Sequence, residues 1–260
     1  MEINQAIPNL PTVSASKIKV YKTCARQYKY KYAVPYKDRP ADDKNVAALL
    51  GTALHKAIEL YYKENANPSQ VFQNVMDDTI TEWEKKKLKI NAAGYYTTAL
   101  SVGKKILREF DWKQYNPIEL ELAFTLPFPN AQNPLVNVTG YIDMLDMDGR
   151  VIDHKSASQA PVQDELNHDP QFVLYAWAYE QMYGVKPYKV IWNHLRTAKQ
   201  YEADVQHNYS DKIAQLTEDM IAMLDAKHFG RRKMDKVCKT ECSFYTLCYG
   251  DKPKVVEEHE

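Results

Sequence analysis

Apolar residues recur along the chain with two spacings, one typical of helices and one typical of strands. Spacings of three and four predict helices in the first half and near the end, and short runs rich in Val, Ile, Leu and Tyr predict strands between them. The expected helices are 16–32, 45–64, 68–89, 95–115, 163–183 and 210–227, and the expected strands are 118–126, 136–145, 150–155, 188–195 and 201–205. This order predicts an α/β fold in which a mixed central sheet is flanked by helices, with an N-terminal helical region packed on one side.

The length of the chain suits one sizeable domain. It has 260 residues, of which 45% are hydrophobic and 26% are charged, and this is enough to bury a single core. Only residues 1–13 and 250–260 read as flexible tails. The chain has neither a run of eighteen apolar residues, which would indicate a membrane span, nor a Gly-x₄-Gly-Lys-Ser/Thr loop, which would indicate a nucleotide-driven motor. Any nucleotide-driven motor that acts with this chain would therefore be a separate protein.

Basic residues gather near both ends of the chain, although its formal net charge is zero. Eight Lys or Arg residues accompany one acid between Lys17 and Arg39, and six accompany one acid between Lys227 and Lys239. A surface built from both stretches would neutralise phosphates with little sequence preference. Tyrosines interleave with the first stretch, and we expect two or three of them to stack on unpaired bases while the others pack in the core: Tyr21, Tyr28, Tyr30, Tyr32 and Tyr36.

Two neighbouring strands in the middle of the chain carry acidic residues, and the segment 146–149 between them has the composition of a turn. If Gly149 takes the left-handed conformation in a three-residue loop, Asp143 lies opposite Asp153, and Lys155 shares their face because side chains alternate along a strand. The two acids could hold one Mg²⁺ or Mn²⁺, which would lower the pKa of a coordinated water. Lys155 could orient that water or offset charge on a phosphate. An ordinary cross-strand ion pair is the alternative that these residues alone leave open.

Other polar residues on the expected elements are ambiguous when taken singly. His55 lies on an amphipathic helix, where it could be a metal ligand or a histidine satisfied within the core. Glu119 and Glu121 are two apart on a strand, so alternation puts both on one face and does not separate them. Gln171 and Tyr175 are four apart on a helix and share one face.

The four cysteines are unevenly spaced. Cys24 stands near the start, whereas the other three, Cys238, Cys242 and Cys248, fall within eleven residues near the end. Because the chain has no secretory signal, this usage predicts reduced thiols, a cytoplasmic location and a metal site instead of disulfides. The spacing of the last three is too irregular for a zinc ribbon.

Several of these segments together resemble a known family. Gly140-Tyr-Ile-Asp143 followed by Asp153-His-Lys155 is similar to the core of the PD-(D/E)XK nuclease superfamily, and specifically to its RecB-like branch. Segments 50–59, 117–121 and 171–175 are similar to further motifs of that branch and stand in the same order. The resemblance implies a single nuclease domain over 14–249: a mainly helical part at 14–115, a restriction-endonuclease-like core at 116–228, and a cysteine segment at 229–249 that closes onto Cys24.

The resemblance also implies roles for particular side chains. His55 would join Asp143 and Asp153 as a metal ligand, and Glu121 would be preferred to Glu119 as a further acidic ligand. The catalytic residues would be the two aspartates together with three others, Lys155, Gln171 and Tyr175.

The split of one cysteine plus three is similar to that of the iron–sulfur variety of RecB-like nucleases, which includes the CRISPR-associated exonucleases. This implies that Cys24, Cys238, Cys242 and Cys248 hold a [4Fe-4S] cluster and join the two ends of the domain. The interval between Cys238 and Cys242 is one residue longer than is familiar in that group, so zinc stays open as the alternative.

The sequence thus predicts a metal-dependent DNA exonuclease that uses Mg²⁺ or Mn²⁺. Its expected substrate is single-stranded DNA or DNA ends, and its expected role is recombination, repair or processing of the phage or CRISPR-associated type. A helicase or recombination partner would be a separate protein. The alternative is an adaptor that binds DNA ends for a larger complex with little turnover of its own.

Overall fold

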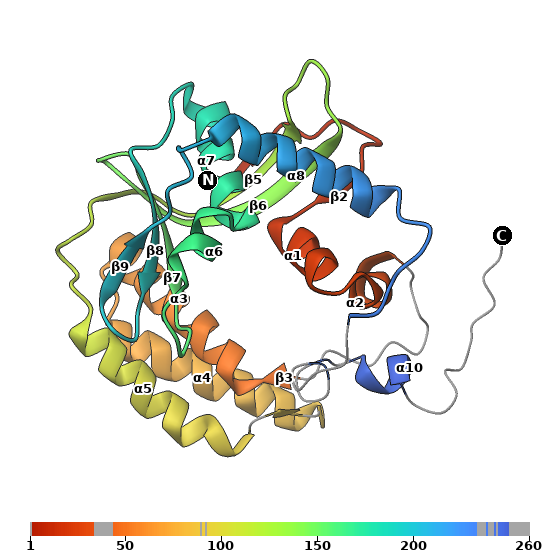
Figure 1. Cartoon of the computed structure of the whole chain (residues 1–260). Helices are drawn as coiled ribbons and strands as arrows, with labels where there is room; N and C mark the ends of the chain where they lie inside the picture. Colours follow the sequence, from red (N-terminus) through yellow and green to blue (C-terminus); the bar gives the residue numbers. More distant parts are fainter. Residues whose placement is uncertain are drawn as a thin grey trace.

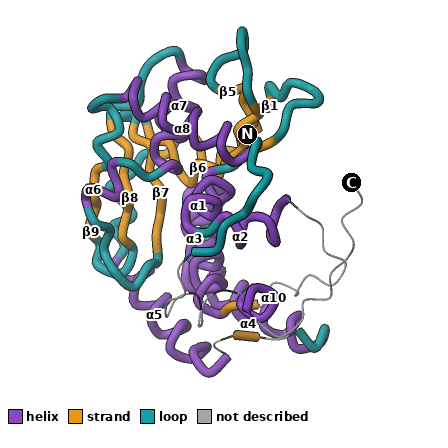
Figure 2. The backbone as a smooth tube through the Cα atoms, turned by 45° about the vertical axis from the view of Figure 1, so that its right-hand side comes forward, coloured by secondary structure: helices purple, strands orange, loops and turns teal. Residues whose placement is uncertain are grey.

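The computed structural model describes residues 2–33, 44–88, 90–91, 93–232, 238, 242 and 244–249. A mixed sheet of seven strands runs through its centre in the order β1-β5-β6-β7-β8-β9, with β2 paired to β6 beside this path (Figures 1 and 2). Strands β5 (Pro117–Phe128), β6 (Val136–Asp146) and β7 (Arg150–Lys155) form an antiparallel meander. Strand β8 (Lys189–His194) is parallel to β7, and β9 (Lys199–Glu202) is antiparallel to β8. The predicted mixed sheet is confirmed.

The first residues of the chain belong to this sheet. Strand β1 (Glu2–Asn4) pairs in parallel with β5, and β2 (Thr12–Val13) pairs in parallel with β6. Two segments of the expected N-terminal tail, Glu2–Asn4 and Thr12–Val13, are thus strands of the sheet. These strands have three and two residues, which is too short to show an alternating pattern in the sequence. Residues 250–260, the other predicted tail, lie outside the described part of the chain.

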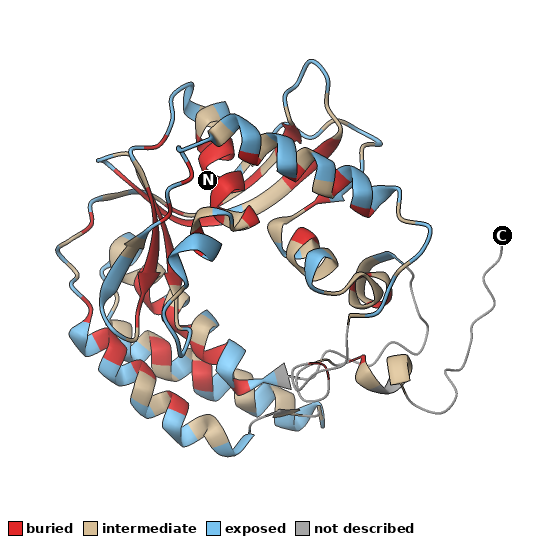
Figure 3. Ribbon diagram, viewed as in Figure 1, coloured by how far each residue is buried: buried red, intermediate tan, exposed pale blue. Residues whose placement is uncertain are grey.

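Helices cover both sides of the sheet (Figures 1 and 3). Helices α3 (Val46–Glu64), α4 (Pro68–Lys85) and α5 (Tyr96–Glu109) share one buried apolar cluster with Leu120, Met144 and Ile152 of the sheet. Helices α7 (Pro170–Tyr183) and α8 (Tyr209–Leu224) share a second cluster with the sheet and with α1 (Ala15–Thr23). The helices predicted at 45–64, 68–89, 95–115 and 210–227 are confirmed, with ends that move by up to six residues.

Two helices that the pattern predicted as continuous are interrupted. The first stops at Cys24, whose extended backbone (φ −161°, ψ 105°) separates α1 from α2 (Ala25–Tyr28) and a following π-helical turn (Lys29–Ala33). The second is divided into α6 (Gln163–Asn167) and α7. The second break follows from Pro170, which cannot continue a preceding helix but suits the first turn of the next one.

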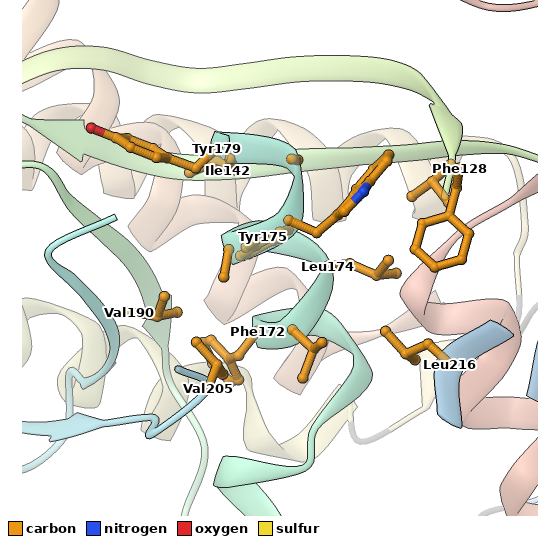
Figure 4. Packing of buried hydrophobic residues seen from close by; sticks show 14 of the residues in the cluster. Phe128, Ile142, Phe172, Leu174, Tyr175, Tyr179, Val190, Val205 and Leu216 are labelled. Carbon is orange, nitrogen blue, oxygen red and sulfur yellow. The ribbon is translucent and has the colours of Figure 1, made fainter. Parts of the chain in front are cut away.

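Helix α7 is enclosed by other elements over most of its length. From Pro170 to Tyr179 every residue except Gln171 is buried, and Figure 4 shows Phe172, Leu174 and Tyr175 packed among side chains of the sheet and of α8. The side chain of Asp169 caps the helix by accepting from the Gln171 N–H at 2.8 Å. Such all-round burial holds the few polar side chains of α7 in one place.

The smaller elements are a two-stranded parallel pair, β3 (Lys44–Asn45) with β4 (Ile90–Asn91), a 3₁₀ turn η2 (Ala93–Tyr95) and the short helix α10 (Tyr245–Tyr249). Within the described residues, we find no helix whose length and hydrophobicity would allow it to cross a membrane.

Close packing between α4 and α5 depends on a glycine. A Cβ atom at Gly103 would lie 2.0 Å from the ring of Phe72, a fully buried side chain that cannot move aside. We expect Gly103→Ala to lower the free energy of unfolding by about 1–3 kcal/mol through overpacking. The matched control is Gly94→Ala, because no heavy atom lies within 4 Å of the added Cβ there. Chemical denaturation of both variants checks this, and equal stabilities would contradict it.

Candidate metal and catalytic centre

The acidic residues lie where β6 and β7 separate. The ladder between these strands contains the pairs Met144–Ile152 and Leu145–Val151; β6 then continues beside β5, and β7 continues beside β8. Asp143 and Asp153 are the next residues on each strand beyond the last pair, as the predicted register required. Gly149 in the connecting turn has the expected left-handed backbone, with φ +72°.

Asp143 is almost completely buried at this fork, with 8% of its surface exposed. Its Oδ2 accepts a hydrogen bond of 2.7 Å from the backbone N–H of His154, a group that the separation of the strands leaves free. Burial raises the pKa of the Asp143 carboxyl, and the nearby Asp153 raises it further, to about 7, although His55 and Lys155 act in the opposite direction. A compensating positive charge would therefore stabilise the ionised form.

His55 extends from α3 to the same point. Its Nε2 lies 2.7 Å from the carbonyl oxygen of His154, and because a carbonyl only accepts, Nε2 carries the proton. Its Nδ1 faces the acids, 3.5 Å from Asp143 Oδ2 and 3.7 Å from Glu121 Oε1. Burial alone lowers the pKa of His55, but the charge of Asp143, with the hydrogen bond and charge of Glu121, outweighs it and raises the pKa to about 9.

The structure separates the two glutamates of β5. Glu121, together with His55 and Asp143, forms a group whose possible ligand atoms all lie within 4.8 Å of one another. Glu119 is near Tyr183 at the end of α7. Burial raises the pKa of the Tyr183 hydroxyl, and the charge of Glu119 raises it further. Glu121 has φ +50°, a left-handed conformation that costs roughly 1–3 kcal/mol outside glycine. This unusual backbone occurs at the residue that meets His55.

Asp153 is not a member of that three-residue group. It is 1% exposed, and its Oδ2 lies 2.7 Å from the ammonium of Lys155. Burial lowers the pKa of Lys155, but the charges of Asp153 and Asp143 outweigh this effect and place it above its ordinary value. Lys155 therefore stays protonated at neutral pH and acts as a fixed cation, not as a base.

Gln171 and Tyr175 of α7 complete the surroundings of Asp153. The Gln171 amide donates to Asp153 Oδ1 at 2.9 Å and to the Tyr175 hydroxyl oxygen at 2.8 Å. The Tyr175 hydroxyl in turn donates to the backbone carbonyl of Tyr141. Burial, followed by the charges of Asp153 and Asp143, raises the pKa of Tyr175 well above its ordinary value. Both side chains lie on one face of α7, as their four-residue spacing predicted, and this face is adjacent to the fork.

Two cavities open at the centre. One, of about 440 Å³, is lined by Asp143, Asp153 and Lys155 as well as by Gln171 and Tyr175. The other, of about 460 Å³, is lined by residues that include His55 and Glu121. The side chains that sequence analysis selected are therefore divided between two adjoining spaces, and Tyr141 lines both of them.

Sequence analysis missed two residues near the centre. Lys19 of α1 lies 2.8 Å from Asp169 and donates to Gln171 Oε1 at 3.2 Å. It counted only as part of the basic N-terminal stretch, because nothing local indicates a contact 152 residues away. The second residue is Tyr141, which the motif included without a role of its own.

The basic stretch is less free than its composition indicated. Lys19 and Lys22 form ion pairs with Asp169 and Asp219. Tyr28 and Tyr30 are each only 8% exposed, in agreement with the expectation that some of these tyrosines belong to the core. Tyr36 and several of the basic residues, namely Lys37, Arg39, Lys233, Lys236 and Lys239, lie outside the described residues.

The cysteines from the two ends of the chain meet. A cavity of about 180 Å³ is lined by all four of them: Cys24, Cys238, Cys242 and Cys248. Burial raises the pKa of the Cys242 thiol, and the charges of Cys238 and Cys24 add to this rise. A hydrogen bond of 3.0 Å from the Arg26 N–H to the Gly230 carbonyl joins the same two segments of backbone.

The donors at the fork fit a small divalent cation. Asp143 and Glu121 provide hard oxygen ligands of the kind that Mg²⁺ and Mn²⁺ prefer, and an imidazole nitrogen is compatible with Mn²⁺. His55 also has the arrangement usual for a metal-binding histidine, in which the second ring nitrogen donates to a backbone carbonyl. The fork could therefore hold a cation beside the buried Asp153–Lys155 pair.

Comparison with known proteins agrees with this geometry. A family model described as the PD-(D/E)XK nuclease superfamily matches residues 12–249. The crystal structure of a provisionally named exonuclease from Eubacterium rectale is similar with a TM-score of 0.54 at 12% identity, over 88% of this chain and 87% of that one; at this identity the likeness concerns the fold alone. The crystal structure of the protein SSO0001 is 16% identical over 90% of this chain and 98% of its own, but its TM-score of 0.34 is too low to indicate a shared fold. The comparison with curated proteins finds no match. The match over 12–249, together with the acid pair and lysine at the strand fork, shows that this chain belongs to the PD-(D/E)XK nuclease superfamily.

Proposed function

We propose that the protein is a divalent-metal-dependent deoxyribonuclease of the RecB-like branch that degrades single-stranded DNA or DNA ends as an exonuclease. The observation that carries the proposal is the meeting of His55, Glu121 and Asp143 at the fork, directly beside the Asp153–Lys155 pair. The exonuclease name of the Eubacterium rectale neighbour supports the same reading. A role in recombination, repair or processing is part of this proposal.

The cation ligands in this proposal are His55, Asp143 and Glu121, with Asp153 next to them. A bound Mg²⁺ or Mn²⁺ would supply an activated water and neutralise charge on the scissile phosphate. Binding requires an unprotonated Nδ1 on His55, so a cation must displace the proton that the raised pKa of His55 keeps there at neutral pH. The Nε2–H bond to the His154 carbonyl then leaves Nδ1 as the ligand atom.

The remaining residues act on the phosphate and on one another. Lys155 is a permanent cation at the fork and stabilises the negative charge that develops on the phosphate oxygens. Asp153 holds the Lys155 ammonium at 2.7 Å, and Gln171 holds the other oxygen of Asp153 at 2.9 Å. Tyr175 remains a neutral hydrogen-bond donor because its pKa is raised well above the ordinary value. This chain of contacts keeps the carboxylate and the ammonium in one orientation.

Removing either member of the Asp153–Lys155 pair should strongly slow cleavage. We expect Lys155→Ala and Asp153→Ala to lower kcat on end-labelled single-stranded DNA with Mg²⁺ or Mn²⁺ by at least roughly 100-fold. A matched control is Lys189→Ala, since Lys189 also pairs with an acid, Glu202, at 2.7 Å but away from the fork. Gel analysis of the products measures the rates. Undiminished cleavage by Lys155→Ala would contradict the proposal, and tight DNA binding without cleavage by the unaltered protein would favour the end-binding adaptor.

The two glutamates of β5 allow a test of the cation site that does not depend on activity. Glu121→Gln should weaken Mn²⁺ binding by at least about tenfold, since a charged ligand is lost while the shape is kept. Glu119→Gln should bind Mn²⁺ as the unaltered protein does. Isothermal titration calorimetry with MnCl₂ measures both. Equal affinities in the two variants would remove Glu121 from the ligand set.

We further propose that the four cysteines hold a [4Fe-4S] cluster that joins the ends of the domain. Their common cavity supports this proposal, because all four cysteines line it. Thiolates are the ligands that such a cluster requires.

Metal analysis and thermal stability test the cysteine site. Anaerobically purified protein should contain about four iron and four acid-labile sulfide atoms per chain. Cys242→Ala should lose them and unfold at a lower temperature, because binding energy coupled to folding disappears. One zinc without sulfide would replace the cluster with a zinc site. An unchanged melting temperature in Cys242→Ala would contradict the joining role.

A further inference from the structure

Tyr141 is exposed to solvent, whereas the other residues of its strand, β6, are buried or half-buried. It is 62% exposed, and it is the one exposed residue of β6, a strand that the structure describes completely. A single exposed aromatic residue on a strand is ordinary. Its position relative to the fork is what distinguishes Tyr141.

The ring of Tyr141 stands beside the acids. Tyr141 and Asp143 are two residues apart on one strand, so their side chains point to the same side and start about 7 Å apart. Tyr141 lines the cavity of Asp143, Asp153 and Lys155, and it also lines the cavity of His55 and Glu121. A DNA strand that entered either cavity would contact the Tyr141 ring next to the acidic residues.

The backbone at Tyr141 is held firmly while its ring is left accessible. The Tyr175 hydroxyl donates to the Tyr141 carbonyl, and the Gln171 amide holds that hydroxyl in turn. The ring itself has no aromatic or hydrogen-bonding partner among the described residues. Tyr28 and Tyr30 differ, since each is buried and packs against other rings.

An accessible ring in a fixed position has the properties of a base-stacking platform. Every base has a π face, so stacking of this kind tolerates any sequence but requires a base that is free of its own neighbours. The distance from Tyr141 to Asp143 is one that a single nucleotide can span between its base and its phosphate. Duplex DNA would offer no such face away from its ends.

We propose that Tyr141 stacks on the base adjacent to the scissile phosphate and thereby selects unpaired nucleotides. This inference rests on the proposed nuclease function and adds to it the residue that determines strandedness. Stacking depends on the ring and not on the hydroxyl, so phenylalanine should replace tyrosine and aliphatic residues should not.

Cleavage of oligonucleotides that lack one base provides the first test. Tyr141→Ala should lower kcat/KM on single-stranded DNA by roughly 5- to 150-fold, the range given by loss of one stacked base. Tyr141→Phe should cleave normally. An abasic residue next to the cleaved bond should impair the unaltered protein by the same factor and should impair Tyr141→Ala no further. The matched control is Tyr188→Ala, since Tyr188 is 67% exposed but lines a different cavity.

A binding measurement separates this inference from the proposed function. Single-stranded DNA that carries 2-aminopurine near one end is added to Lys155→Ala protein with Mn²⁺, and stacking is followed as quenching of the 2-aminopurine fluorescence. Quenching should persist with Tyr141→Phe added to this background and disappear with Tyr141→Leu. Near-ultraviolet circular dichroism confirms that each variant is folded.

The outcomes are distinct. Absence of cleavage by the unaltered protein, with quenching that depends on the Tyr141 ring, would contradict the nuclease proposal and support base stacking. Normal cleavage with quenching unaffected by Tyr141→Leu would overturn the inference and leave the nuclease intact. A defect of Tyr141→Ala that is equally large on abasic and normal DNA would also overturn it, because the residue would then act on the shape of the site.

Discussion

Strands β6 and β7 stop pairing just where each carries an aspartate, and the properties of the centre follow from this separation. Two carboxyl groups are taken out of water close together, an arrangement that costs free energy unless other groups compensate. A backbone N–H freed by the fork donates to Asp143, and Lys155 pairs with Asp153. These contacts do not fully offset burial and the repulsion between the two carboxylates, which together raise the pKa of Asp143 to about 7. A cation at this point would stabilise the fold and complete the chemistry by the same interaction.

Helices from opposite layers reach this fork. His55 comes from α3, which packs in one apolar cluster, and Gln171 and Tyr175 come from α7, which packs in the other. Because α7 is buried nearly all round, its two polar side chains have little freedom, and they satisfy each other as well as Asp153 and the Tyr141 carbonyl. The orientation of the acids is thus maintained by the packing of the whole domain.

The N-terminal segment connects the fork with the cysteine cavity. Helix α1 ends at Thr23, and the next residue, Cys24, lines that cavity. Lys19, one turn before the end of α1, contacts Gln171 of α7 and Asp169, which caps that helix. Strands β1 and β2 fix the start of the same segment to β5 and β6. The N-terminal segment is thus attached to the sheet through β1 and β2 and to the start of α7 through Lys19.

The sequence by itself determined the order of the main elements and the register of the β6–β7 hairpin, whereas the polar residues expected at the centre were selected by the resemblance of several motifs to a known family. The order and the register depend on local periodicity and turn chemistry, which neighbouring residues specify. Only the tertiary structure shows that Glu121 lies next to His55 and Asp143 while Glu119 does not, because both have the same strand parity and a left-handed backbone at Glu121 has no local signature. The same holds for the pairing of β1 and β2, the break at Cys24, the contact of Lys19 and the exposure of Tyr141. Each of these depends on residues far apart in the sequence, and periodicity carries no information about such contacts.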